Sequence, residues 1–245
     1  MSKWNDSDDP RRRQLIQALA AGVFTAALPG SDAFAQTVLG NLPGPLPPGR
    51  SIFRMSGEVT INGAPATLAS AIKPGDTLVT GKDSELVFIV DDTAMILRAG
   101  SNVTLESRKP DVGSILLTGL RMLTGKLLSV SRNKPMQLRT TTATIGIRGT
   151  GLYIEADPEL TYFCTCYGAT DVVSNDDPES RDSVVATHHD KPLYITSSAS
   201  KGRNVRAAGF KNHTDQELML IESLVGRSVP FVFPGGAYTA PRTRY

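Results

Sequence analysis

A strand pattern interrupted by glycines is the feature that most constrains the fold of this chain. Residues Thr140 to Gly151 read T-T-T-A-T-I-G-I-R-G-T-G, where Ile145 and Ile147 alternate with small or polar residues. Alternation with period two and many β-branched residues are typical of a half-buried β-strand. Glycine adopts backbone conformations that a side chain forbids, so we expect the strand to bend or to approach another backbone closely. The turn after Arg148 is predicted to require such a conformation at Gly149.

The residues before this strand alternate between short apolar segments and turns. Apolar residues alternate in 52–61, Asn62-Gly63 has the composition of a hairpin turn, and Lys73 to Asp76 read K-P-G-D. We expect Asp76 to bond its own turn. Further apolar segments lie at 78–80, 86–90, 95–97 and 103–105. Short strands with closely spaced turns predict an all-β domain over residues 51–155.

Four motifs of this segment resemble the FecR domain, an all-β module of the periplasm. They are G-D-T-L-V-T-G at 75–81, D-S-E-L-V-F at 83–88, G-S-N-V-T-L at 100–105 and T-T-T-A-T-I-G-I-R-G-T at 140–150. The sequence departs from the family at 91–93, where Asp-Asp-Thr replaces the usual Asp-Gly-Ser turn. The resemblance implies a twisted β-sandwich or β-solenoid-like domain of short strands.

The resemblance to FecR domains also implies a function. It implies a non-enzymatic binding or sensing module that relays signals through contacts with another periplasmic or envelope protein. FecR regulators typically carry a cytoplasmic helical domain and a transmembrane helix ahead of the periplasmic part, and neither is found in this sequence. Direct control of a sigma factor is therefore not expected.

Residues 1–35 have the pattern of an export signal. Arg11, Arg12 and Arg13 precede an apolar segment, Leu15 to Leu28, and Ala33-Phe34-Ala35 offers the small residues that signal peptidase accepts. The arginine pair and the modest apolar segment resemble a twin-arginine signal, without the usual Ser or Thr before the pair. An uncleaved anchor is the alternative, although this segment is shorter than the roughly 20 apolar residues that a span needs. We expect a periplasmic protein with no membrane span after signal removal.

Two further segments flank the predicted β-domain. Residues 36–50 are rich in proline and glycine and are predicted to be a linker. Residues 156–245 are predicted to form a β-rich extension with one C-terminal helix. Thr214 and Glu217 have the spacing of a capping box, and Gly226 follows the last apolar residue of the helix. An apolar stripe on this helix consists of Leu218, Ile221, Leu224 and Val225.

Both cysteines of the chain lie in this extension. Cys164 and Cys166 are two residues apart in a strand pattern, which places their thiols on one face, opposite Phe163, Thr165 and Tyr167. A disulfide between them would be strained, because α-carbons two residues apart in a strand are separated by about 6.6 Å. A tetrahedral metal ion requires sulfurs only about 3.8 Å apart.

The three histidines of the chain complete a candidate metal site. His188 and His189 come directly after a strand pattern and are taken to continue it. Adjacent residues of a strand point to opposite faces, so we expect only one of the two to bind the metal, together with His213. Two thiolates and two imidazoles suit zinc, iron or copper, and Asp190 is available to orient a histidine. The alternative is structural: two buried apolar cysteines, a histidine pair in a turn, and a histidine beside a helix cap.

Composition and motifs argue against two other classes of function. The formal net charge is +2, with no basic block in the body of the chain, so nucleic acid is not expected as a partner. The sequence contains no G-x-S-x-G, no H-E-x-x-H and no phosphate-binding glycine loop before a helix, so an enzyme is not expected.

Overall fold

The computed structural model of this chain describes residues 42–108, 115–132, 135–197 and 202–231. The predicted signal, 1–35, lies outside the described residues, as does the first part of the linker. Residues 42–50 of that linker contain no helix or strand. A search of the described residues finds no helix that is long and apolar enough to span a membrane.

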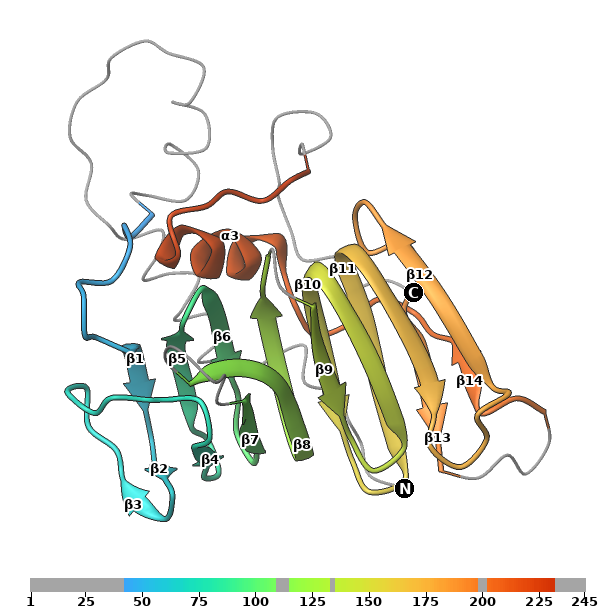
Figure 1. The fold of residues 1–245 in the computed structure, drawn as a ribbon, viewed down its shortest axis with the longest axis horizontal. Coiled ribbons are helices and arrows are strands. Elements are labelled where there is room, and N and C mark those ends of the chain that lie inside the picture. The colour runs from blue at the N-terminus through green and yellow to red at the C-terminus, as the bar shows by residue number, and fades with distance from the viewer. Residues whose placement is uncertain (1–41, 109–114, 133–134, 198–201, 232–245) are drawn as a thin grey trace, which may run out of the picture.

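The prediction of an all-β fold with one C-terminal helix is confirmed. The helix is α3, Asp215–Leu224, and it follows the last strand (Figure 1). The strands are β1 (Ile52–Ser56), β2 (Val59–Ile61), β3 (Ala64–Pro65), β4 (Thr77–Thr80), β5 (Glu85–Val90), β6 (Thr93–Leu97), β7 (Asn102–Arg108), β8 (Leu116–Val130), β9 (Pro135–Arg139), β10 (Ala143–Ala156), β11 (Leu160–Ser174), β12 (Arg181–Ala186), β13 (Leu193–Thr196) and β14 (Val205–Ala207).

Three long strands, β8, β10 and β11, join these elements into one sheet with two layers. Strand β8 pairs with β7 through its first part, with β10 through 125–130 and with β6 through 127–130. Strand β10 pairs with β9 through 144–148 and with β8 through 151–156. Strand β11 pairs with β13 through 160–163 and with β12 through 168–173. The sheet thus folds over on itself, and it continues past residue 155 because β11 pairs with β10 along most of its length.

A glycine with positive φ lies where each long strand changes partner. The φ angles are 100° at Gly125, 59° at Gly149 and 92° at Gly168. At Gly125 a β-carbon would lie 2.3 Å from the α-carbon of Ser101, which no side chain could tolerate. The left-handed conformation expected at Gly149 is confirmed, and it coincides with a shift of register between Arg148 and Gly151.

An apolar cluster, the interlayer core, fills the space between the two layers. It draws side chains from nearly every strand, because one face of each strand points inward. Its fully buried members include Leu78, Leu86, Phe88, Leu105, Leu120, Leu138, Ile145, Ile154, Phe163 and Leu193.

A second cluster, the helix interface, lies on the outer face of the layer that contains β5 and β6. Helix α3 packs there across β6 and β8 (Figure 1). The buried apolar members of the helix interface are Val87, Ala94, Ile96, Leu128, Val130, Tyr153, Tyr162, Cys164, Cys166, Tyr167, Leu218, Ile221 and Leu224.

The predicted caps and turns are largely confirmed. Thr214 is the N-cap of α3 and forms a capping box with Glu217. Asn62 and Gly63 both have positive φ in the turn between β2 and β3. The carboxylate of Asp76 accepts a hydrogen bond from the backbone nitrogen of Lys73, within its own turn.

The position of Tyr167 differs from the prediction. Strict alternation along β11 placed it opposite the cysteines, whereas its ring lies in the helix interface with them. Irregular pairing next to Gly151 and the positive φ of Gly168 break the alternation at this point. The Tyr167 hydroxyl therefore reaches Glu222 of α3.

Candidate metal centre

Strand β11 places two free thiols beneath α3. Cys164 and Cys166 share one face of the strand, as predicted, and both side chains are fully buried in the helix interface. The backbone nitrogen of His189 donates to the carbonyl oxygen of Cys166, with a distance of 2.9 Å. This bond fixes the turn after β12 against the strand that carries the cysteines.

The histidine pair does not lie on a strand, contrary to the prediction. Strand β12 ends at Ala186, and His189 has a φ of 56° in the turn that follows. As a result both rings point toward the start of α3 instead of toward opposite faces of a sheet. The His189 ring packs against Phe210 and against His213.

His213 lies directly before the N-cap of α3. Its ring is almost completely buried and stacks on Tyr153 of β10, with ring centroids 4.5 Å apart. Its Nδ1 lies 2.8 Å from the carbonyl oxygen of Lys211. Because a carbonyl only accepts, Nδ1 carries the proton and Nε2 presents its lone pair to the cysteines.

The structure brings together Cys164, Cys166, His189 and His213. One ligand atom from each lies within 4.8 Å of the other three. The Cys164 sulfur is 3.6 Å from His189 Nδ1, the Cys166 sulfur is 3.3 Å from His213 Nε2, and the two nitrogens are 3.1 Å apart. Around a tetrahedral zinc ion, bond lengths of about 2.3 Å to sulfur and 2.05 Å to nitrogen give sulfur–nitrogen separations of about 3.6 Å and nitrogen–nitrogen separations of about 3.3 Å. The four residues fit such an ion.

Asp215, and not Asp190, orients the histidines. The Asp190 carboxylate accepts hydrogen bonds from Thr187 and from the backbone of His188, so it closes its own turn. Asp215 is the first residue of α3, and its carboxylate oxygens lie 2.9 Å from the Nε2 atoms of His188 and His189. A metal-binding histidine commonly donates its other ring proton to a carboxylate in this way.

His189 lies between two hydrogen-bond acceptors. Its Nε2 faces the Asp215 carboxylate, and its Nδ1 faces the lone pair on His213 Nε2. A neutral imidazole has one ring proton and can serve only one of these acceptors. A proton on Nε2 satisfies Asp215, and the Nδ1 lone pair then faces Cys164, whose thiol can donate to it and whose thiolate would share a metal ion with it.

Burial and mutual contacts shift the pKa values of the four residues. Burial opposes charge on His189, but its hydrogen bonds to Asp215 and Cys164 raise its pKa. Burial also opposes the Cys164 thiolate, but the hydrogen bond from Cys166 and the nearby histidines hold its pKa well below the usual value. Burial raises the pKa of Cys166 and lowers that of His213. The site thus favours one thiolate facing a cationic partner.

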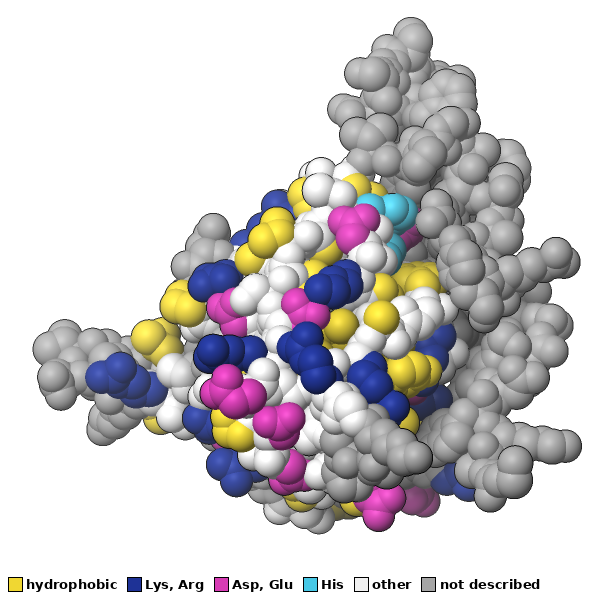
Figure 2. Space-filling model, turned by 90° about the vertical axis from the view of Figure 1, so that its right-hand side faces the viewer, with side chains coloured by type: hydrophobic (Ala, Val, Ile, Leu, Met, Phe, Trp, Pro, Cys, Tyr) yellow, Lys and Arg dark blue, Asp and Glu magenta, His cyan; other side chains and the backbone are white. Residues whose placement is uncertain are grey.

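His188 lies outside the four-residue set but next to it. Its Nε2 shares the Asp215 carboxylate with His189, and its side chain is 21% exposed. Figure 2 shows histidine side chains reaching the surface beside acidic groups.

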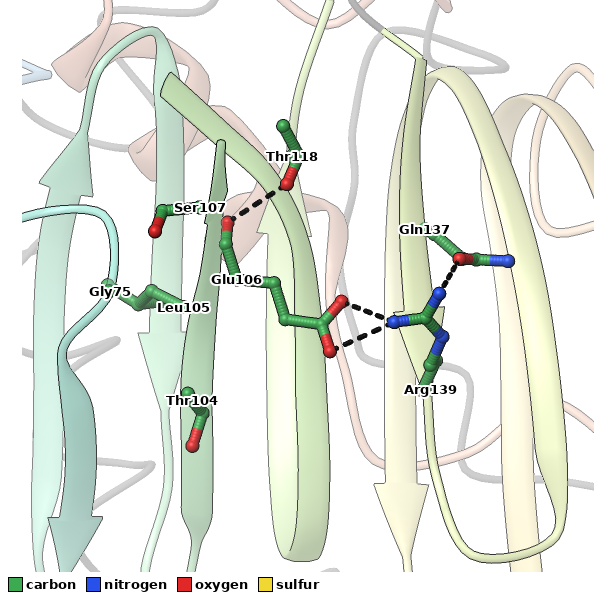
Figure 3. A pocket seen from close by; sticks show the side chains of 8 residues that line it. All are labelled: Gly75, Thr104, Leu105, Glu106, Ser107, Thr118, Gln137 and Arg139. Carbon is green, nitrogen blue, oxygen red and sulfur yellow. Dashed lines mark hydrogen bonds and ion pairs between the residues drawn. The ribbon is translucent and has the colours of Figure 1, made fainter. Parts of the chain in front are cut away.

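A hollow on the described surface lies over β7, β8 and β9 (Figure 3). The carboxylate of Glu106 points across it to Arg139, at 2.8 Å, and also pairs with Arg121. Arg139 in turn donates to the side chain of Gln137. Because these charged groups already satisfy one another, this hollow is a weaker candidate site than the Cys/His cluster.

Comparisons with known proteins give no family for this chain. No protein-family profile and no curated protein matches it. Among solved structures, two crystal structures of a "putative anti-sigma factor" from Parabacteroides distasonis are similar to it, at 18% and 19% identity and TM-scores of 0.40 and 0.41. Each match covers 54% of this chain and 58% of the other. Similarity at this level supports no conclusion about function.

Proposed function

We propose that this protein is a non-enzymatic binding module of the FecR type that holds one zinc ion through Cys164, Cys166, His189 and His213. The convergence of four ligand atoms from three separate segments, all within 4.8 Å of one another, carries the proposal. The ion connects β11, the turn after β12 and the residue before the cap of α3. Its role is to stabilise one arrangement of these segments.

The ligand set favours zinc over iron or copper and favours binding over catalysis. Two thiolates and two imidazoles in a tetrahedral arrangement form a closed set of four protein ligands, which is typical of structural zinc sites. Catalytic zinc sites instead keep a position for water or substrate. The ring nitrogens that do not face the ion are held by Lys211 and Asp215, which orients both imidazoles before the ion binds.

The test is metal stoichiometry of the reduced, untagged protein, measured by elemental analysis. We expect about one zinc per chain in the parent and almost none in the double variant Cys164→Ser, Cys166→Ser. Zinc at 100 times its Kd should stabilise the metal-free parent by about 2.7 kcal/mol, and it should not stabilise the double variant.

The matched control is Ser183→Ala, an exposed hydroxyl on the neighbouring strand β12 that bonds only Asp171 among the described contacts. It should keep the parent's zinc content. A parent that contains no metal, and that zinc, copper and iron all fail to stabilise, would show that the cluster is structural.

The exported state of the protein is the second part of the proposal. The arginine pair in residues 1–35 supports export by the twin-arginine route, which carries folded proteins and so suits a metal bound before export. The partner is proposed to be another protein of the periplasm or envelope. Replacing Arg12 and Arg13 with lysine should retain the precursor in the cytoplasm, and an unchanged periplasmic yield would exclude this route.

A further inference from the structure

The buried position of the four ligands raises the question of how an ion reaches them. Cys164, Cys166 and His213 are at most 1% exposed. The side chains of His189 and Asp215 are 8% and 3% exposed, whereas His188 is 21% exposed. Among the described residues of this cluster, exposure to solvent therefore rises from the cysteines through His189 to His188.

The more exposed residues of this cluster form a second group of possible metal ligands. His188, His189 and Asp215 also present one ligand atom each within 4.8 Å of the others. Two imidazole nitrogens and one carboxylate oxygen suit a divalent transition-metal ion and leave its remaining positions to water. Partial exposure of His188 allows a hydrated ion to approach this group.

The His189 ring belongs to both groups. Its Nε2 faces Asp215 and His188, while its Nδ1 faces Cys164 and His213. An ion held on the outer side leaves Nδ1 free to donate its proton to His213. When the ion moves to the inner side, the proton on Nδ1 and the remaining thiol protons are released to solvent, and Nε2 takes up a proton from solvent and donates it in a hydrogen bond to Asp215.

We propose, on the basis of the proposed zinc site, that His188, His189 and Asp215 form an outer docking site through which a divalent ion passes to the buried Cys/His set. His188 is a ligand of the outer site only and is not a ligand of the final site. The outer site binds the ion first and weakly, because it lacks thiolates and retains water. The inner site then binds it more tightly and without water.

The test is the rate at which Co²⁺ enters the metal-free, reduced full chain. Thiolate-bound cobalt gives a charge-transfer absorption that the sulfur-free outer site does not, so stopped-flow absorbance reports arrival at the cysteines. In the parent the rate should saturate as Co²⁺ is increased, because the outer site fills before transfer. His188→Gln keeps a donor to Asp215 but removes the imidazole ligand. This variant should reach the same final absorbance as the parent. At low Co²⁺ concentration it should do so at least about tenfold more slowly, and its rate should increase linearly with the Co²⁺ concentration.

Two controls separate loading from folding and from surface charge. Asp182→Asn removes a partly exposed acid of β12 that pairs with Lys191, and it should load at the parent's rate. Equal melting temperatures of the metal-free parent and His188→Gln, with equal hydrogen-exchange protection of α3, would exclude altered folding as the cause of slow loading. Loading of His188→Gln at the parent's rate would overturn the docking site and leave the zinc site intact. Absence of the thiolate band from the parent would overturn both.

Discussion

The interlayer core and the helix interface are built from different chemistry. The core between the two layers consists of aliphatic and aromatic side chains from almost every strand. The helix interface combines apolar residues with three buried carboxylates of α3: Asp215, Glu217 and Glu222. Apolar burial is non-directional, whereas buried carboxylates and metal ligands require specific partners. The first region therefore provides most of the stability, and the second specifies where α3 and its flanking segments lie.

Glu217 and Glu222 of the helix interface are paired with arginines, two from distant parts of the chain and one from just beyond the end of α3. Glu217 pairs with Arg98 at 2.6 Å. Glu222 pairs with Arg132 at 2.9 Å and with Arg227 at 2.7 Å, and it also accepts from the Tyr167 hydroxyl. Such pairs add little net stability but are costly to break, because the remaining charge is left buried.

The largest expected effect is on the interlayer core. Phe163→Ala removes a fully buried ring and should lower the free energy of unfolding by about 3–5 kcal/mol. Chemical denaturation of the metal-free chain measures it. Val185→Ala, at a side chain that is 81% exposed, is the control and should change stability by less than about 0.5 kcal/mol. Equal effects of the two substitutions would contradict the role assigned to the core.

Glu222→Gln tests the helix interface at nearly constant volume. It leaves Arg132 and Arg227 without a carboxylate and should destabilise the docked helix by about 3 kcal/mol. Hydrogen exchange should show lost protection in α3, with the interlayer strands unchanged. Glu159→Gln, at an exposed position, is the control. Equal loss of protection in both regions would show that they unfold as one unit.

The difference between the two regions explains what the sequence could predict. Turns such as Asn62-Gly63 and the cap Thr214–Glu217 were predictable because their signals lie within a few neighbouring residues. The four candidate ligands were also predictable by type, since the chain has few cysteines and histidines and all of them lie in the last third.

Other features depended on contacts that no local pattern records. Asp215 was missed as the group that orients the histidines, because the turn carrying His188 and His189 is 26 and more residues away in sequence. The wrong position predicted for Tyr167 has the same cause, since the irregular pairing depends on how β10 meets β11. A glycine at 168 was the one available signal for that break.

Gly149→Val tests the positive-φ glycines on which the interlayer core depends. Its φ of 59° disfavours any side chain by about 1–2 kcal/mol, and a β-branched one by more. We expect a melting temperature several degrees lower. Gly146→Ala is a matched control within the same strand, because its φ is not positive and the nearest atom to an added β-carbon is 3.9 Å away. A Gly149→Val protein as stable as the parent would show that the strand does not need this conformation.

The smallest expected effect addresses what holds α3 in place. Thr214 Oγ1 accepts from the backbone nitrogen of Glu217, and Thr214→Ala should cost about 1 kcal/mol in stability, with Thr214→Ser close to the parent. The same substitution lies next to His213, so it also reports on metal binding. If α3 is already docked in the metal-free protein, the zinc Kd should change less than about twofold, because the lost cap affects free and bound forms equally.

If only the metal held α3 in place, zinc binding would have to supply the free energy that the cap no longer provides. Zinc affinity would then fall about fivefold, the equivalent of 1 kcal/mol. We expect the smaller change, because the ion pairs of Glu217 and Glu222 and the apolar contacts of Leu218 and Ile221 act without the metal. Isothermal titration with zinc, in parallel with denaturation of the metal-free Thr214→Ala and Thr214→Ser proteins, separates the two outcomes. A fivefold weaker Kd would show that the helix interface is a consequence of metal binding and not its scaffold.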